Sequence, residues 1–110
     1  MKNLADSIRW ALGPREILDG VEIVEDPGRF GAAEIQGKIH ADVIGLALIG
    51  KVGVNQALEI SEQALYVKDP AEEFGKFLNL TPISISELSF SNIGTPALRI
   101  AEHLESIRAY

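Results

Sequence analysis

Cysteine is absent from all 110 residues of the chain. This absence excludes a disulfide framework, a thiolate metal site and a cysteine nucleophile. A chain without thiols also suits a reducing compartment. We therefore expect a soluble, cytoplasmic protein.

Basic residues are few and scattered. The chain has 16 acidic and 10 basic side chains, and its formal net charge at pH 7 is −6. A negative protein repels phosphate backbones and anionic headgroups at long range, and no cluster of lysines and arginines offsets this repulsion. The composition therefore disfavours nucleic acid and membrane surfaces as partners.

Long apolar runs are missing too. The longest uncharged apolar run, Val43 to Gly50, is far shorter than the roughly 18 residues that a membrane-spanning helix requires. Near the N-terminus, Asp6 and Arg9 interrupt what would have to be the apolar core of a signal peptide. We expect neither a membrane span nor a signal peptide.

Residues with catalytic or metal-binding chemistry form no recognisable set. His40 and His103 are the only histidines, and neither is flanked by carboxylates at a metal-ligand spacing such as HExxH. His40 and Asp42 could form a dyad, although a solvated histidine at the start of a helix is the simpler interpretation. We predict no metal site, no cofactor and no catalytic residues.

Acidic residues gather at one point, where Glu22, Glu25 and Asp26 lie close together in sequence. Hydrolysis of a glycoside needs two carboxylates that converge on one bond. These three stand beside a Pro-Gly turn, however, where acidic side chains usually face solvent. We interpret them as surface residues.

The segment "GLALIGKV" has the glycine and lysine spacing of a phosphate-binding P-loop, with Gly45, Gly50 and Lys51 in place. The next position is Val52, so the hydroxyl that would bind Mg²⁺ is missing. The residues between the glycines are apolar and suit a buried helix better than an open loop. We predict a core helix in which Gly45 and Gly50 allow close packing, and which ends near Gly50.

The chain as a whole, residues 1–110, is expected to be one domain with a mainly α fold. Its length suits one core, and its 46% hydrophobic and 24% charged residues are ordinary globular values. Apolar spacing, capping residues and prolines predict about five or six short helices. They begin at Asn3, near Ile39, at Val54, near Ala71, at Thr81 and at Thr95, where Thr95 caps the last helix and Pro96 opens it, and Ile107 faces inward.

Two interpretations stay open for residues 20–37, which are rich in glycine and proline. In the first, Val21 and Ile23 pair with Ala33 and Ile35 in a small β-hairpin around "DPGRFG". In the second, the segment is a folded loop that packs on its own apolar side chains.

Residues 74–104 resemble the C-terminal half of a repressor-type helix-turn-helix domain. Phe74 to Leu80 would be its first helix, Thr81 to Leu88 its recognition helix, and "PALRIAEHL" the helix that supports them. This resemblance implies a DNA-binding regulator. The recognition segment has no lysine, arginine, asparagine or glutamine to contact bases or phosphates, and it carries Glu87.

A second resemblance is to an uncharacterised family of small, mainly helical bacterial domains. That family has a helix reading C-A-x-G-A and a W-N-D step before a capped final helix. Here "DVIGLA" keeps Gly45 of the first motif, with Asp42 and Val43 in place of Cys and Ala, and "SNIGTPALRIAEHL" keeps Asn92 of the second. The resemblance implies a helical fold and no known activity.

These observations favour a non-enzymatic interaction or regulatory module that binds a protein partner or a second copy of itself, with the apolar segment Leu46 to Val54 as the self-association surface. A helix-turn-helix DNA-binding regulator is the first alternative. A small ligand-binding domain or enzyme is the second, and it would need a pocket on which polar groups converge. The candidate pocket residues are His40, Asp42, Asn92 and Arg99.

Overall fold

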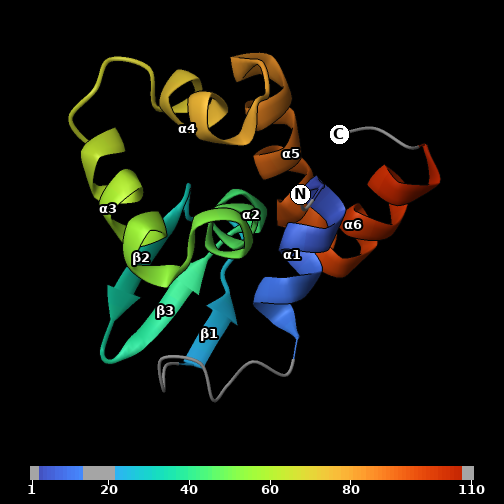
Figure 1. Cartoon of the computed structure of the whole chain (residues 1–110), viewed down its shortest axis with the longest axis horizontal. Coiled ribbons are helices and arrows are strands. Elements are labelled where there is room, and N and C mark those ends of the chain that lie inside the picture. Colours follow the sequence, from blue (N-terminus) through green and yellow to red (C-terminus); the bar gives the residue numbers. More distant parts are fainter. Residues whose placement is uncertain (1–2, 14–21, 108–110) are drawn as a thin grey trace.

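Helix α2, Val43–Val52, lies in the middle of this computed structural model, and the other elements surround it (Figure 1). Every residue from Val43 to Gly50 is buried. A helix that is apolar on all sides is stable in water only when neighbours cover all of them. The prediction of a core helix here is confirmed, whereas Leu46 to Gly50 offer no surface for self-association.

The structure describes residues 3–13 and 22–107. Within these ranges the chain forms six helices and three strands, which confirms the mainly α fold class with a small β element. In chain order the elements are α1 (Leu4–Leu12), β1 (Glu22–Glu25), β2 (Ala32–Ile35), β3 (Lys38–Ala41), α2 (Val43–Val52), α3 (Val54–Ala64), α4 (Pro70–Leu78), α5 (Pro82–Gly94) and α6 (Ala97–Ser106).

Local capping fixes most helix ends. Asn3 Oδ1 accepts a 2.7 Å hydrogen bond from the amide of Asp6 at the start of α1, and Thr81 Oγ1 accepts one of 3.1 Å from the amide of Ser84 at the start of α5. Such bonds satisfy amides that have no partner inside the helix. Helix α2 ends at Val52, shortly after the predicted end near Gly50, and Gly53, whose φ of 91° suits glycine, follows it as the C-cap residue.

At the two glycines of the P-loop-like segment, the backbone of α2 lies in close contact with the backbone of a neighbouring segment. A Cβ atom at Gly50 would lie 2.6 Å from Cα of Ser7 on α1, and one at Gly45 would lie 2.6 Å from the carbonyl carbon of Gly31. Neither position has room for a side chain. The prediction that these glycines serve close packing is confirmed.

The three strands form one sheet in the order β1-β3-β2. β1 runs parallel to β3, and β2 runs antiparallel to it through a two-residue turn, Gln36–Gly37, in which both residues have positive φ. Ile39 and Ala41 of β3 are buried on the face of the sheet toward α2. The sheet thus covers one side of the central helix.

Neither interpretation left open for residues 20–37 fits the described part of this segment. It contains two strands and is therefore no folded loop, and the hairpin pairing of Ile23 with Ala33 and Ile35 is wrong because β3 lies between β1 and β2. The other predicted hairpin residue, Val21, lies outside the described residues. The error arose because Ile39 was assigned to the start of a helix, although it belongs to a strand of only four residues, Lys38–Ala41. A strand this short has too few residues for alternation to show.

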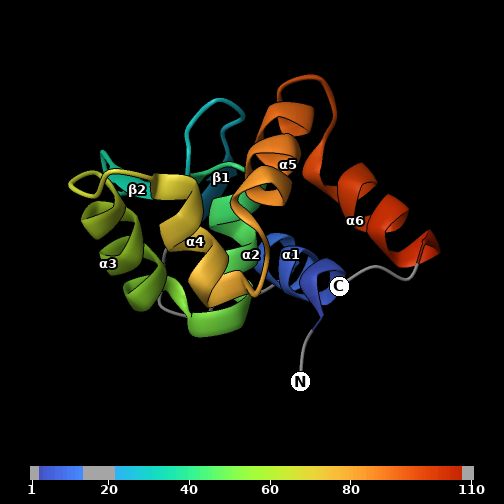
Figure 2. The same ribbon diagram turned by 90° about the horizontal axis from the view of Figure 1, so that it is seen from above.

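The helices stand on several sides of α2. Figure 2 shows α3 on one side, and α1 and α6 on the other.

Helix α5 continues to Gly94, well beyond the predicted Leu88, and Thr95 follows it without capping α6 through its side chain. Ile107, predicted to face inward, is 54% exposed. None of the helices in residues 3–13 and 22–107 is long and apolar enough to cross a membrane.

Candidate functional site

Asp42, one of the four candidate residues, lies between β3 and α2 and is fully buried. Its Oδ1 accepts hydrogen bonds from the amides of Gly45, at 3.0 Å, and Gly31, at 3.2 Å. Its Oδ2 accepts a 2.7 Å bond from the hydroxyl of Ser89 on α5. The side chain therefore caps α2 and also ties the loop before β2 and helix α5 to it.

Burial raises the pKa of the Asp42 carboxyl, because a charge is poorly solvated in the protein interior. The hydrogen bonds from Gly45, Ser89 and Gly31 act in the opposite direction, since they stabilise the ionised form. A raised pKa in a cleft can mark a catalytic acid. Asp42 is fully buried and donors occupy both of its oxygens, so the hydrogen bonds of this carboxyl hold the fold together.

Asn92, a second candidate, lies at the same end of α2. Its Oδ1 accepts a 2.9 Å bond from the amide of Val43, and its Nδ2 donates to Glu25 Oε2, at 2.9 Å, and to the carbonyl oxygen of Thr95, at 3.0 Å. Glu25 Oε2 also accepts a 2.8 Å bond from the amide of Ala97. One buried amide thereby joins β1, α2 and the turn between α5 and α6.

Together, Asp42, Ser89, Asn92 and Glu25 form what we term the α2 cap cluster. Within the described part of the chain, no buried side-chain nitrogen or oxygen lacks a hydrogen-bond partner. A side chain that binds a ligand or takes part in catalysis needs a donor or acceptor atom that is free to bond to the substrate. The buried polar atoms of the α2 cap cluster are all engaged with one another or with the backbone, so the geometry of the cluster explains how it stabilises the fold.

His40 does not join this cluster. It lies on β3, not at the start of a helix, and its Nδ1 is 3.2 Å from Asp26 Oδ2. Arg29 Nε lies 3.4 Å from the same oxygen. The dyad with Asp42, which was the less favoured interpretation, does not form, because His40 Nδ1 lies next to Asp26 and the Asp42 oxygens accept hydrogen bonds from other donors.

The carboxylates that are neighbours in sequence separate in the fold. Glu25 belongs to the α2 cap cluster, Asp26 pairs with His40, and Glu22 lies 3.7 Å from Lys38 Nζ. Each has a different partner, so they do not converge as a glycosidase pair must. Among the described residues, no three His, Cys, Asp or Glu side chains gather as a metal site would require.

Arg99 is on α6, apart from the other three candidates. It lines a pocket of about 230 Å³ between α5 and α6, together with His103. Of the four candidates, the structure therefore brings together Asp42 and Asn92 alone. Ser89, Glu25 and His103, which matter at these places, were not selected from the sequence.

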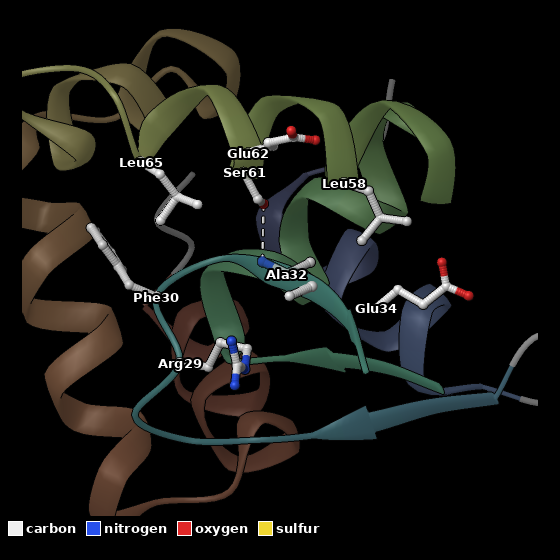
Figure 3. A pocket seen from close by; sticks show the side chains of 9 residues that line it. Arg29, Phe30, Ala32, Glu34, Leu58, Ser61, Glu62 and Leu65 are labelled. Carbon is white, nitrogen blue, oxygen red and sulfur yellow. Dashed lines mark hydrogen bonds between the residues drawn. The ribbon is translucent and has the colours of Figure 1, made fainter. Parts of the chain in front are cut away.

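A larger pocket of about 390 Å³ lies between β2 and α3 (Figure 3). The hydroxyl of Ser61 accepts a 2.9 Å bond from the amide of Ala32, and this bond links α3 to β2. Glu34 and Glu62 contribute carboxylates to its lining, and the side chains of Phe30, Leu58 and Leu65 make most of its apolar wall. The position of Ser61 on the apolar face of its helix was a usable signal, because a buried hydroxyl needs a partner.

Comparisons with protein-family models, with curated proteins and with solved structures found no match for this chain.

Proposed function

We propose that this chain is a non-enzymatic interaction module that docks on a partner protein through the outer face of α5. One observation carries the proposal. Ile83, Phe90 and Ile93 are 72%, 76% and 62% exposed, although all three are large and apolar. We call these three residues the α5 row.

The α5 row lies along one side of the helix. Positions 83 and 90 are two helical turns apart, and position 93 follows one turn later. Single exposed hydrophobic residues are normal, whereas a row of them marks an interaction surface. Anchors at this spacing are typical of a helix that inserts into an apolar groove of another protein.

Charge favours a different protein over a second copy as the partner. Glu87 lies between Ile83 and Phe90 on the same side of α5, and α5 carries no lysine or arginine. If two copies paired antiparallel through this face, the two Glu87 carboxylates would lie near each other and repel. An apolar groove with a basic side chain opposite Glu87 would match the surface instead.

The same features of α5 disfavour DNA as the partner. The outer face of α5 presents apolar side chains, Ser86 and Glu87 where a recognition helix would present groups that bind phosphates and base edges. With a net charge of −6 for the whole chain, no long-range attraction to duplex DNA is expected.

The test begins with a photo-crosslinking amino acid at position 86, which identifies the partner in the native host. The purified partner is then titrated with the unmodified chain and with Phe90→Ser. We expect Phe90→Ser to weaken binding by more than tenfold, because truncation of a buried interface anchor costs about 2 kcal/mol or more.

Leu65→Ser is the matched control, because Leu65 is also 76% exposed but lies at the end of α3. It should bind the partner as the unmodified chain does. Equal binding by Phe90→Ser and the unmodified chain would refute the proposal. A dimer in light scattering that Phe90→Ser dissociates would replace the partner protein by a second copy, and salt-dependent binding to duplex DNA would favour the regulator alternative.

A further inference from the structure

The pocket between α5 and α6 is lined by four polar side chains with free hydrogen-bonding capacity. Arg99 and His103 are one turn apart on α6, and Ser91 and Thr95 are one turn apart along α5 and its end. Within the ranges that the structure describes, none of these four side chains has a hydrogen bond or an ion pair. Here, unlike in the α2 cap cluster, donors are available.

Helix α6 carries both acidic and basic side chains, and Glu105 lies on the side away from the pocket. Glu105 faces α1, where its two carboxylate oxygens lie 2.7 and 3.1 Å from the guanidinium nitrogens of Arg9. Glu102 is on the same flank and helps to raise the pKa of Arg9. Arg99 and His103 line the pocket toward α5, and no ion pair within the described residues joins either of them to a carboxylate, although Glu102 follows Arg99 by three positions.

The floor of the pocket is apolar. It consists of the half-buried Leu88 and the buried Ile100 and Leu104. The volume of about 230 Å³ is below the range typical of drug-sized ligands, about 300–1,000 Å³. The site is therefore suited to a compact molecule with one polar end.

We propose that this pocket binds a small organic oxyanion, with a phosphate or carboxylate group at Arg99 and His103 and a short apolar part over Leu88 and Ile100. A guanidinium presents two parallel N–H groups that match either oxyanion, and this geometry makes arginine the usual residue for such groups. The hydroxyls of Ser91 and Thr95 can each donate one further hydrogen bond. The inference concerns a ligand site that is separate from the proposed docking of the α5 row.

The test is a titration of the full chain with butyl phosphate and with butyrate, followed by NMR of backbone amides in a buffer without phosphate. We expect at least one of the two anions to shift the amides of residues 91–103. Inorganic phosphate should bind more weakly than butyl phosphate, because it lacks the apolar part, and butylamine should not bind. Stronger binding of butyl phosphate would assign a phosphate ligand, and stronger binding of butyrate a carboxylate.

Arg99→Gln should weaken anion binding about tenfold or more, since the variant loses the charge-assisted hydrogen bonds of the guanidinium to the anion. Arg99 is exposed, so this variant should fold normally. Lys68→Gln is the control, because it removes the same charge at an exposed position between α3 and α4. Equal weakening in both variants, binding of butylamine, or no shifts with either anion would overturn the proposal.

Discussion

Gly50→Ala should destabilise the protein, even though alanine normally favours a helix. The new Cβ would lie 2.6 Å from Cα of Ser7 and closer still to the carbonyl oxygen of that residue. Carbon atoms pack best at about 3.5–4.0 Å, so α1 would have to move away from α2 by roughly 1 Å. Backbone atoms block the position, and no rotamer change relieves the contact.

The magnitude follows from two opposing effects. Overpacking of a core destabilises a protein by up to about 3 kcal/mol, whereas replacement of glycine by alanine inside a helix stabilises it by about 1 kcal/mol. We expect the free energy of unfolding to fall by about 2 kcal/mol, which is roughly 10 °C in Tm for a domain of this size. Urea unfolding followed by far-UV circular dichroism measures it.

Gly94→Ala is the matched control. Gly94 is the last residue of α5, it is exposed, and a Cβ there would meet no atom within 4 Å. The free energy of unfolding of the Gly94→Ala variant should equal that of the unmodified chain or be slightly higher. If Gly50→Ala unfolded at the same urea concentration as Gly94→Ala, the close backbone contact between α1 and α2 would be refuted.

Two further predictions concern the α2 cap cluster. Asn92→Ala should lower the free energy of unfolding by about 3 kcal/mol, because the amide of Val43 and the carboxylate of Glu25 each lose a hydrogen-bond partner. Urea unfolding measures this change. A decrease below about 1 kcal/mol, which is typical of a surface substitution, would contradict the prediction. For Asp42, burial raises the folded-state pKa, so its contribution to stability is present below the ordinary value of 3.8 and is lost as the pH rises through the folded-state pKa. The unmodified protein should therefore lose stability relative to Asp42→Asn as the pH rises above 3.8, and parallel pH profiles of unfolding would show that the pKa is not raised.

The helices could be predicted because their signals are local. Asn3 caps the residues that follow it within one turn, and Thr81 and Pro82 mark the start of α5 in the sequence itself. The length of α5 was missed for the opposite reason. Phe90 and Ile93 are apolar but exposed, so the apolar stripe expected of a surface helix does not appear in its second half.

The sheet and the α2 cap cluster depend on contacts that sequence spacing does not encode. β1 pairs in parallel with β3 across a connection that contains β2, and no turn motif signals such a pairing. Asp42 and Asn92 were selected for their polar chemistry. Their actual partners, Ser89 and Glu25, lie 47 and 67 positions away along the chain, respectively.

The position of Asn92 has a consequence for folding kinetics. Its amide joins Val43 and Glu25, which are 49 and 67 positions away. Chain loops of that length must close before these hydrogen bonds can form, and closure costs entropy that the bonds only later offset. We expect the hydrogen bonds of Asn92 to form after the rate-limiting step of folding. Asn92→Ala should therefore speed unfolding and leave the folding rate nearly unchanged. This one side chain would then determine how long the native state lasts rather than how quickly it is reached.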